Sequence, residues 1–151
     1  LEDMKSIVLF TLIAFTTVSW SQENSKEQAE VRAVIDQLFD GMRSGDSSLV
    51  RAVFHEDARA FTSYKHEDLF QLHQGSIDNF IAVVGTPHDE VWDERISNVA
   101  IQVDDGLAQV WMDYSFYLGD TFSHKGVNAM QLAFMDGRWQ ILQLADTRRK
   151  K

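Results

Sequence analysis

The 151-residue sequence contains no cysteine and only one proline. The absence of cysteine excludes thiol catalysis, disulfide frameworks, iron–sulfur clusters and cysteine-ligated zinc. Basic residues are also few, with 14 lysines and arginines against 23 acidic residues, and the formal net charge of −9 disfavours nucleic acid or an anionic membrane surface as a partner. Apolar residues make up 44% of the chain and charged residues 25%, which is typical of one folded domain.

Motifs for common cofactors are absent as well. The sequence has no Gly-x-Ser-x-Gly, Walker or dinucleotide-binding motif, so we expect no cofactor. Two short runs contain possible metal ligands, His55-Glu56-Asp57 and His66-Glu67-Asp68. Adjacent residues on a strand point to opposite faces, so neither run should form a site alone, and we expect no metal ion.

The longest apolar run lies near the N-terminus, at residues 7–18, after Met4 and Lys5. As a helix it would span about 18 Å, which is too short to cross a bilayer. A basic start, a short apolar run and the small residues Ser19 and Ser21 are typical of a secretory signal peptide. We interpret residues 1–3 as a cloning or gene-prediction remnant, the rest of residues 1–21 as the signal peptide, and residues 22–151 as the mature domain of a secreted or periplasmic protein. An ordered N-terminal helix or membrane anchor is the alternative.

The first half of the mature chain predicts three helices and two strands. Apolar residues at three- and four-residue spacing indicate an amphipathic helix over residues 25–44. Leu49, Val50, Val53 and Phe54 indicate a shorter second helix, and a third amphipathic helix contains Ile77, Phe80, Ile81 and Val84. Asp46 and Ser76 are suited to cap the second and third helices. Short strands are predicted at residues 58–64 and 69–74.

From residue 91 to residue 148 the apolar period is two, which predicts a four-stranded antiparallel meander. Its turns are Asp105-Gly106, Gly119-Asp120-Thr121 and Asp136-Gly137. These turns set the register and place one largely apolar set of pairs on a common face. The pairs are Val103 with Ala108, Ile101 with Val110, Val99 with Met112, Phe116 with His124, Met112 with Asn128, Val110 with Met130, Ala108 with Leu132, Phe134 with Trp139 and Leu132 with Ile141. Because three helices are available to cover this face, we predict an α+β roll.

The opposite, outer face of the meander carries more apolar residues than a solvated surface normally does. They are Trp111, Tyr117, Val127, Ala129, Leu142 and Leu144. A contiguous patch of this kind is typical of an interface, so we predict a homodimer through the outer sheet face. The alternative is an amphipathic sheet with scattered exposed apolar residues.

Polar groups on the inner face gather at one end of the predicted sheet. Tyr114, His124 and Asn128 project inward there beside Phe116, and Gly126 opposite Tyr114 leaves space for a small molecule. Tyr64 and Trp92 are candidates for the same mouth, although a bulge near Ser97 would decide which face Trp92 takes. We predict that these residues form a ligand pocket.

His124 has three possible roles at this end: a structural core histidine, a ligand contact, or a proton-transfer group. Tyr114 is either a hydrogen-bond donor to a ligand or a core aromatic residue. Asp113 is the nearest carboxylate, but the register sends it to the outer face together with Asp146. We therefore expect no carboxylate on the inner strand face.

Several segments taken together resemble the nuclear-transport-factor-2-like superfamily, nearest to its putative lumazine-binding, SnoaL-like branch. They are Asp40-Gly41-Met42-Arg43-Ser44-Gly45-Asp46, Phe54-His55-Glu56-Asp57-Ala58, Trp92-Asp93-Glu94-Arg95-Ile96, Ala108-Gln109-Val110-Trp111-Met112-Asp113-Tyr114, Phe122-Ser123-His124-Lys125-Gly126-Val127-Asn128 and Gly137-Arg138-Trp139-Gln140-Ile141. The resemblance implies a cone-shaped pocket between three N-terminal helices and a curved antiparallel sheet, a fold also called cystatin-like, and dimers are common in the superfamily.

The resemblance leaves the activity open, because relatives include isomerases, cyclases, dehydratases and non-catalytic binding domains. Isomerase relatives need a pocket carboxylate, and dehydratase relatives use a histidine with an aspartate and tyrosines. His124 and Tyr114 match part of the second pattern, but no inward aspartate is expected here.

Three functions therefore remain under consideration. The first is small-molecule binding by Tyr64, Trp92, Tyr114, Phe116, His124 and Asn128. The second is a cofactor-independent lyase or isomerase that uses His124 for proton transfer. The third is a dimeric interaction module with a filled cone.

Overall fold

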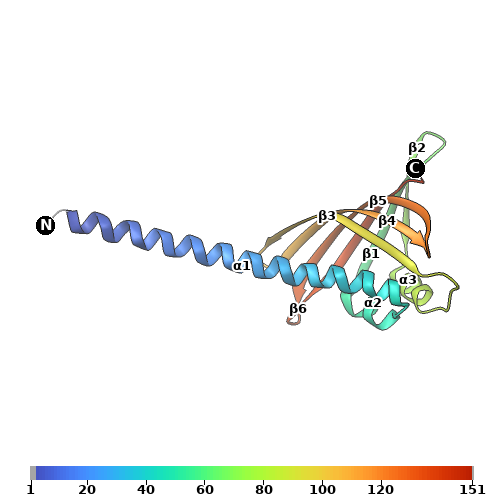
Figure 1. The fold of residues 1–151 in the computed structure, drawn as a ribbon, viewed down its shortest axis with the longest axis horizontal. Coiled ribbons are helices and arrows are strands. Elements are labelled where there is room, and N and C mark those ends of the chain that lie inside the picture. Colours follow the sequence, from blue (N-terminus) through green and yellow to red (C-terminus); the bar gives the residue numbers. More distant parts are fainter. Residues whose placement is uncertain (1–2, 151) are drawn as a thin grey trace.

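The computed structural model describes the backbone of residues 3–150 and the side chains of residues 24–150. Within this range, three helices pack on one six-stranded sheet (Figure 1). The elements are α1 (Asp3–Ser44), α2 (Ser47–Val53), β1 (Phe54–His66), β2 (Leu69–Gly75), α3 (Ile77–Val84), β3 (Trp92–Asp104), β4 (Leu107–Leu118), β5 (Thr121–Met135) and β6 (Arg138–Arg148). The predicted α+β class is confirmed.

The predicted signal peptide lies at residues 1–21, where no side chain is described, so it stays a prediction. The backbone of α1 begins at Asp3, whereas the apolar periodicity predicted a helix only from residue 25. Among the residues with described side chains, no helix has the length and hydropathy that a membrane span requires.

α2 and α3 begin close to their predicted starts because local capping groups are present. Asp46 accepts hydrogen bonds from the backbone N–H groups of Ser48 and Leu49 at the start of α2. Ser76 accepts one from Asn79 at the start of α3. The second helix was predicted to include Phe54, but this residue begins β1 and is buried in the core. Its extended backbone lets β1 pair with β6.

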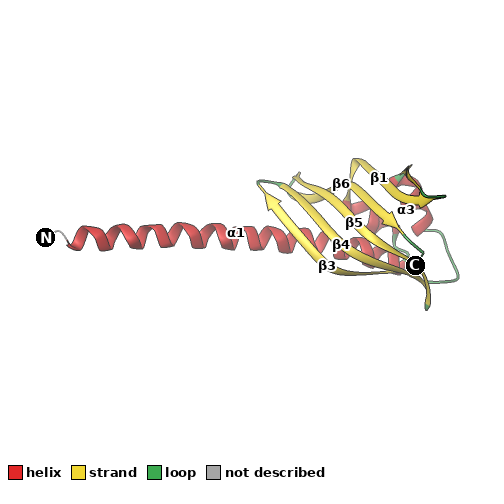
Figure 2. Ribbon diagram, turned by 90° about the horizontal axis from the view of Figure 1, so that it is seen from above, coloured by secondary structure: helices red, strands yellow, loops and turns green. Residues whose placement is uncertain are grey.

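The sheet order is β2-β1-β6-β5-β4-β3, and Figure 2 shows the strands side by side above the helices. β3 to β6 form the predicted antiparallel meander, whereas β1 joins β6 in parallel, which the sequence did not indicate. The predicted pairs are confirmed except Val99 with Met112, which falls within an irregular segment between Ser97 and Ala100. The inner residues of β4 and β5 pack on the buried face of α1 in one hydrophobic core.

Two β-bulges change which residues face the helices. Between Ser97 and Ala100 one extra residue enters β3, and Leu142 is the extra residue of β6. Side chains alternate along a strand, so one inserted residue inverts the facing of everything beyond it. Leu144, which pairs with the buried Met130, therefore lies on the inner face, and its predicted place on the outer face is wrong.

The outer face keeps a smaller apolar group after this correction. Trp111 pairs with Ala129 there and is 59% exposed. Tyr117 and Val127 are half-buried. The homodimer stays a prediction, since no partner chain is present to test it.

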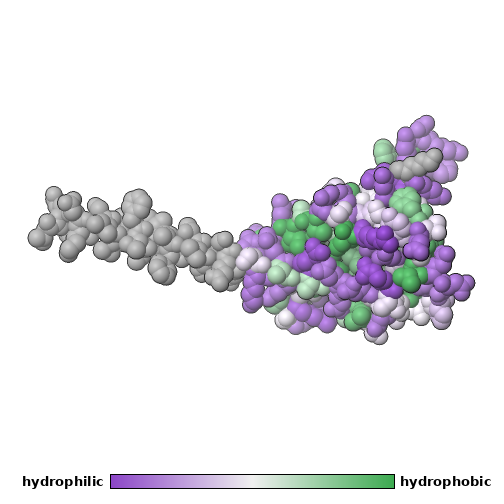
Figure 3. Space-filling model, viewed as in Figure 1, coloured by the Kyte–Doolittle hydropathy of each residue, from purple (hydrophilic) through white to green (hydrophobic). Residues whose placement is uncertain are grey.

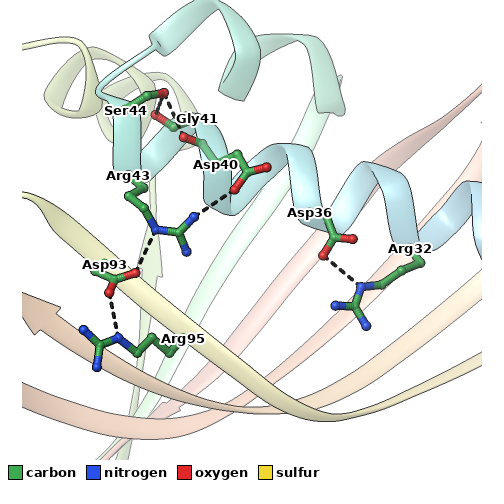
Figure 4. Close-up of polar contacts among 8 residues, drawn as sticks. All are labelled: Arg32, Asp36, Asp40, Gly41, Arg43, Ser44, Asp93 and Arg95. Atoms are coloured by element: carbon green, nitrogen blue, oxygen red, sulfur yellow. Dashed lines mark hydrogen bonds and ion pairs between the residues drawn. The ribbon is translucent and has the colours of Figure 1, made fainter.

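An ion-pair network ties β3 to the end of α1 (Figure 4). Arg43 Nε donates to Asp93 Oδ1 at 2.9 Å, and Arg95 Nε donates to Asp93 Oδ2 at 2.7 Å. Hydrogen bonds from Arg95 and Arg43 hold the pKa of Asp93 below its ordinary value. The next residue in the strand, Glu94, points to the opposite face of β3.

Candidate functional site

A cavity of about 370 Å³ lies between the helices and the sheet. Its apolar wall comes from α1, α3 and the inner sheet face, with Leu38, Phe39, Met42, Ile77, Phe80, Trp92, Phe116, Leu118, Met130 and Leu144. The volume falls within the range of small-molecule sites, which are mostly apolar with a few placed polar groups.

The polar groups of the cavity form two hydrogen-bonded clusters. Asn128 Nδ2 donates to Glu94 Oε1 at 2.6 Å. Asp146 accepts from Thr62 Oγ1 at 2.5 Å and from the Tyr114 hydroxyl at 3.1 Å. These side chains come from five different strands, so the two clusters exist only when the sheet has assembled.

Both cavity carboxylates were missed by the sequence prediction. Glu94 pairs with Phe116 and Asp146 with Asn128, which places both on the inner face. The prediction that the inner face carries no carboxylate is therefore wrong. A clue was present, because the bulge considered near Ser97 for Trp92 applies equally to Glu94, two residues further along the same strand.

Burial has a large effect on the acid–base properties of this end. It raises the pKa of Glu94 to about 7, and the negative charge of Asp146 acts in the same direction. Burial, followed by the charges of Asp146 and Glu94, also raises the pKa of Tyr114 well above its ordinary value. At neutral pH the cavity thus holds a neutral phenol and a carboxyl group able to gain or lose a proton.

His124 lies at the cavity wall among aromatic rings. Its ring centroid is 5.8 Å from that of Tyr114 and 5.1 Å from that of Phe116, and its Nδ1 is 3.0 Å from Ser123 Oγ. Burial lowers the pKa of His124, and the positive charge of Arg148 lowers it further. A neutral imidazole at neutral pH can donate one hydrogen bond and accept another.

The structure brings five of the six predicted ligand residues together: Trp92, Tyr114, Phe116, His124 and Asn128 all line the cavity. Tyr64 does not. It lies in a neighbouring hollow, and its hydroxyl donates to Gln71 at 2.9 Å. The contribution of these residues to ligand binding stays a prediction.

The space predicted beside Gly126 is filled by protein. A Cβ added at Gly126 would lie 1.7 Å from the carbonyl oxygen of Thr147 and 2.7 Å from the Tyr114 ring. Glycine is needed there because the backbone of β6 crosses closely and the Tyr114 ring packs over the strand. Gly126 is accordingly not among the residues that line the cavity.

The donor atoms of His55, Glu56 and Asp57 lie within 4.8 Å of one another, so the prediction that adjacent strand residues could not converge is wrong. This stretch begins β1 at an irregular pairing with β6, where strict alternation fails. Glu56 and Asp57 are exposed, and exposed acidic groups commonly cluster without an ion. The geometry alone does not make this a metal site.

Known proteins include a matching family and solved structures with this fold. Residues 26–144 match the family described as "Putative lumazine-binding". No curated protein matches the chain. An NTF2-like protein of unknown function from Shewanella baltica is similar with a TM-score of 0.66 and 16% identity, covering 84% of this chain and 97% of that one.

Two further solved structures show the same fold. An NTF2-like protein with a cystatin-like fold from Novosphingobium aromaticivorans has a TM-score of 0.69 and 13% identity, and the match covers 88% of each chain. A protein described as a "putative dehydratase from the NTF2-like family" from Streptomyces avermitilis has a TM-score of 0.62 and 11% identity, covering 83% of this chain and 97% of that one. The family match spans most of the chain, so this protein belongs to the family described as "Putative lumazine-binding", and it shares the fold of these NTF2-like structures.

Proposed function

We propose that this protein is a secreted or periplasmic domain that binds a small molecule in the cavity between the helices and the sheet. The main support for the proposal is the composition of the cavity. Its walls are apolar and aromatic, and carboxyl, amide, hydroxyl and imidazole groups lie at one end. Such an arrangement can bury an apolar ligand body and orient it by a few hydrogen bonds. Membership of a family described as lumazine-binding supports a compact, ring-containing ligand.

A fluorescence titration with N-phenyl-1-naphthylamine, an uncharged aromatic probe, tests this proposal. Ala60 lines the cavity, so Ala60→Leu places a larger side chain within it. Ala29 is exposed on α1, and Ala29→Leu is the matched control. Overpacking costs on the order of 1–3 kcal/mol, so we expect Ala60→Leu to bind the probe about tenfold more weakly than wild type.

The control should bind like wild type, and thermal midpoints of all three proteins show whether each is folded. Saturable binding that Ala60→Leu leaves unchanged would place the probe elsewhere and contradict the proposal. If the folded wild type does not bind the probe, the result would contradict small-molecule binding in the cavity and favour the dimeric interaction module.

The location rests on the predicted signal peptide in residues 1–21. Expression of the full chain in a bacterial host followed by N-terminal sequencing tests it. We expect export and a mature N-terminus at Gln22. An uncleaved, cytoplasmic product would contradict it.

A second candidate, proton transfer by a cofactor-independent lyase or isomerase, is supported by the two cavity carboxylates. Glu94 has a pKa of about 7, a value suited to general acid–base catalysis, and His124 lines the same cavity. Asp146 supplies an inward aspartate beside Tyr114. The similar Streptomyces avermitilis protein is described as a "putative dehydratase".

Deuterium exchange at the α-carbon of a panel of cyclic ketones in D₂O, followed by NMR, tests for proton abstraction. We expect exchange above the buffer rate in wild type, reduced about 10²-fold or more in His124→Ala and Glu94→Gln. Exchange at the buffer rate with every ketone that binds would reject this candidate and leave the binding function.

A further inference from the structure

A second hollow adjoins the polar end of the cavity, and Thr62 and Arg148 line both spaces. Its other lining residues are Tyr64, Lys65, His73, Arg149 and Lys150. We call this space the basic hollow. The shared residues make it an extension of the cavity rather than a separate site.

The parallel pairing of β1 with β6 builds this extension. Thr62 pairs with Asp146 and Tyr64 with Arg148, so both strands continue past the cavity in the same direction. Alternation along the strands places Tyr64 and Arg148 on the face that carries Thr62 and Asp146. His73 of β2 pairs with Thr62 and closes the far side.

The hollow concentrates positive charge in a protein with a net charge of −9. Four of its lining residues are lysine or arginine, and none is acidic. Lys65 Nζ lies 2.7 Å from Asp68 Oδ1, and Arg148 Nη2 lies 3.8 Å from Asp146 Oδ2. Among the described residues, Arg149 and Lys150 have no carboxylate partner. Figure 3 shows that this end of the molecule, around the C-terminus, is mainly hydrophilic.

Positive charge of the basic hollow acts on His124 at the cavity wall. After burial, the charge of Arg148 lowers the pKa of His124, the charge of Asp146 raises it, and the charge of Lys150 lowers it. A negative group placed between Arg148 and Lys150 would therefore be attracted, while an apolar body attached to it would lie against the cavity wall.

We propose that the ligand is an amphiphilic anion: an apolar body in the cavity joined to one carboxylate, sulfonate or phosphate group in the basic hollow, where Arg148, Arg149 and Lys150 hold it. This inference rests on the proposed binding function and names the class of molecule bound. Guanidinium groups are suited to the anion because they can donate two parallel hydrogen bonds to it.

Two fluorescent probes that share one aromatic body test the inference. 8-Anilinonaphthalene-1-sulfonate carries the anion, and N-phenyl-1-naphthylamine does not. We expect wild type to bind the sulfonate about tenfold more tightly at low salt, and we expect this preference to shrink at about 1 M salt, where charges are screened. Titration of inorganic phosphate against the bound sulfonate reports whether a free anion occupies the same place.

The double variant Arg149→Gln/Lys150→Gln removes two exposed charges from the hollow, and Lys26→Gln/Arg32→Gln removes two exposed charges from α1 as a matched control. We expect the first variant to weaken sulfonate binding about fivefold and to leave the uncharged probe within roughly twofold of wild type. The control should change neither affinity.

The outcomes separate the two proposals. If neither probe binds, the binding function itself fails. If both probes bind equally, or if both double variants weaken sulfonate binding to the same extent, the cavity binds ligands but the basic hollow does not recognise an anion, and the inference is overturned.

Discussion

Glu94→Gln should change how the stability of the protein depends on pH. The side chain lies on the inner face of β3, where Asn128 Nδ2 donates to its Oε1 at 2.6 Å. The substituted amide keeps a carbonyl oxygen that can accept this hydrogen bond. It has no proton to release, so the comparison with wild type isolates the ionisation of one carboxyl group.

The magnitude follows from the pKa of Glu94, which burial raises from 4.5 to about 7. Because the folded protein keeps the proton that the unfolded chain releases, this contribution to stability is complete below about pH 4.5 and is lost as the pH rises through about 7. A shift of one pKa unit corresponds to about 1.4 kcal/mol, so the full loss of folding stability is about 3 kcal/mol. We expect a smaller loss of stability, about 2 kcal/mol, because the Glu94 side chain is only half-buried and solvent screens its charge.

Urea unfolding at pH 5 and pH 8, followed by tryptophan fluorescence, measures this difference. We expect Glu94→Gln to gain about 2 kcal/mol over wild type between the two pH values. The exposed Glu90→Gln is the control and should follow wild type. His124 acts in the opposite direction, because its lowered pKa costs stability as the pH falls below about 6.5, but it is present in all three proteins. A pH dependence identical to wild type would refute the burial argument.

Three further predictions concern packing and assembly. Gly126→Ala should destabilise the protein by about 4 kcal/mol or prevent folding, because a Cβ would lie 1.7 Å from the Thr147 carbonyl oxygen. Gly119→Ala is the comparison: it has open space around the Cβ and a positive φ, and should cost about 1 kcal/mol in urea unfolding. Tyr114→Phe should cost about 1–3 kcal/mol, since the one hydroxyl hydrogen of Tyr114 is shared between Asp146 and the Thr147 carbonyl oxygen. A loss near zero would mean that these acceptors find other partners. Trp111→Ser should convert the predicted dimer to monomer in analytical ultracentrifugation, and an unchanged sedimentation coefficient would remove the outer face as the interface.

The register of the meander was predictable because short turns are determined by local backbone preferences. Asp105 and Gly106 have φ values of 43° and 82°, and Asp136 and Gly137 have 53° and 78°. Aspartate and glycine tolerate this left-handed region better than other residues, so these two turns were recognisable from their residues. Period-two alternation then placed Tyr114, His124 and Asn128 on the cavity side without any tertiary information.

Asp146 was missed because strict alternation was carried through the bulge in β6, and Glu94 was missed because the bulge considered near Ser97 was applied only to Trp92. The bulge in β6 leaves one weak trace, the adjacent apolar residues Ile141 and Leu142, which break the period of two. In β3, Asn98 has a φ of 51°, a conformation that asparagine tolerates, but its presence alone does not fix the number of inserted residues. Leu144 and Asp146 were assigned to the wrong face because of the bulge in β6, and Glu94 was not assigned to a face.

The amino-acid sequence by itself determined the three amphipathic helices, the turns of the meander and the facing of β4 and β5, because each depends on residues within a few positions of one another. Only the tertiary structure decided the parallel pairing of β1 with β6, the two bulges, and the meeting of Glu94, Asp146 and the basic hollow at one end of the cavity. A bulge forms where contacts between distant strands outweigh the lost ladder hydrogen bonds, and that balance involves residues far apart in the chain.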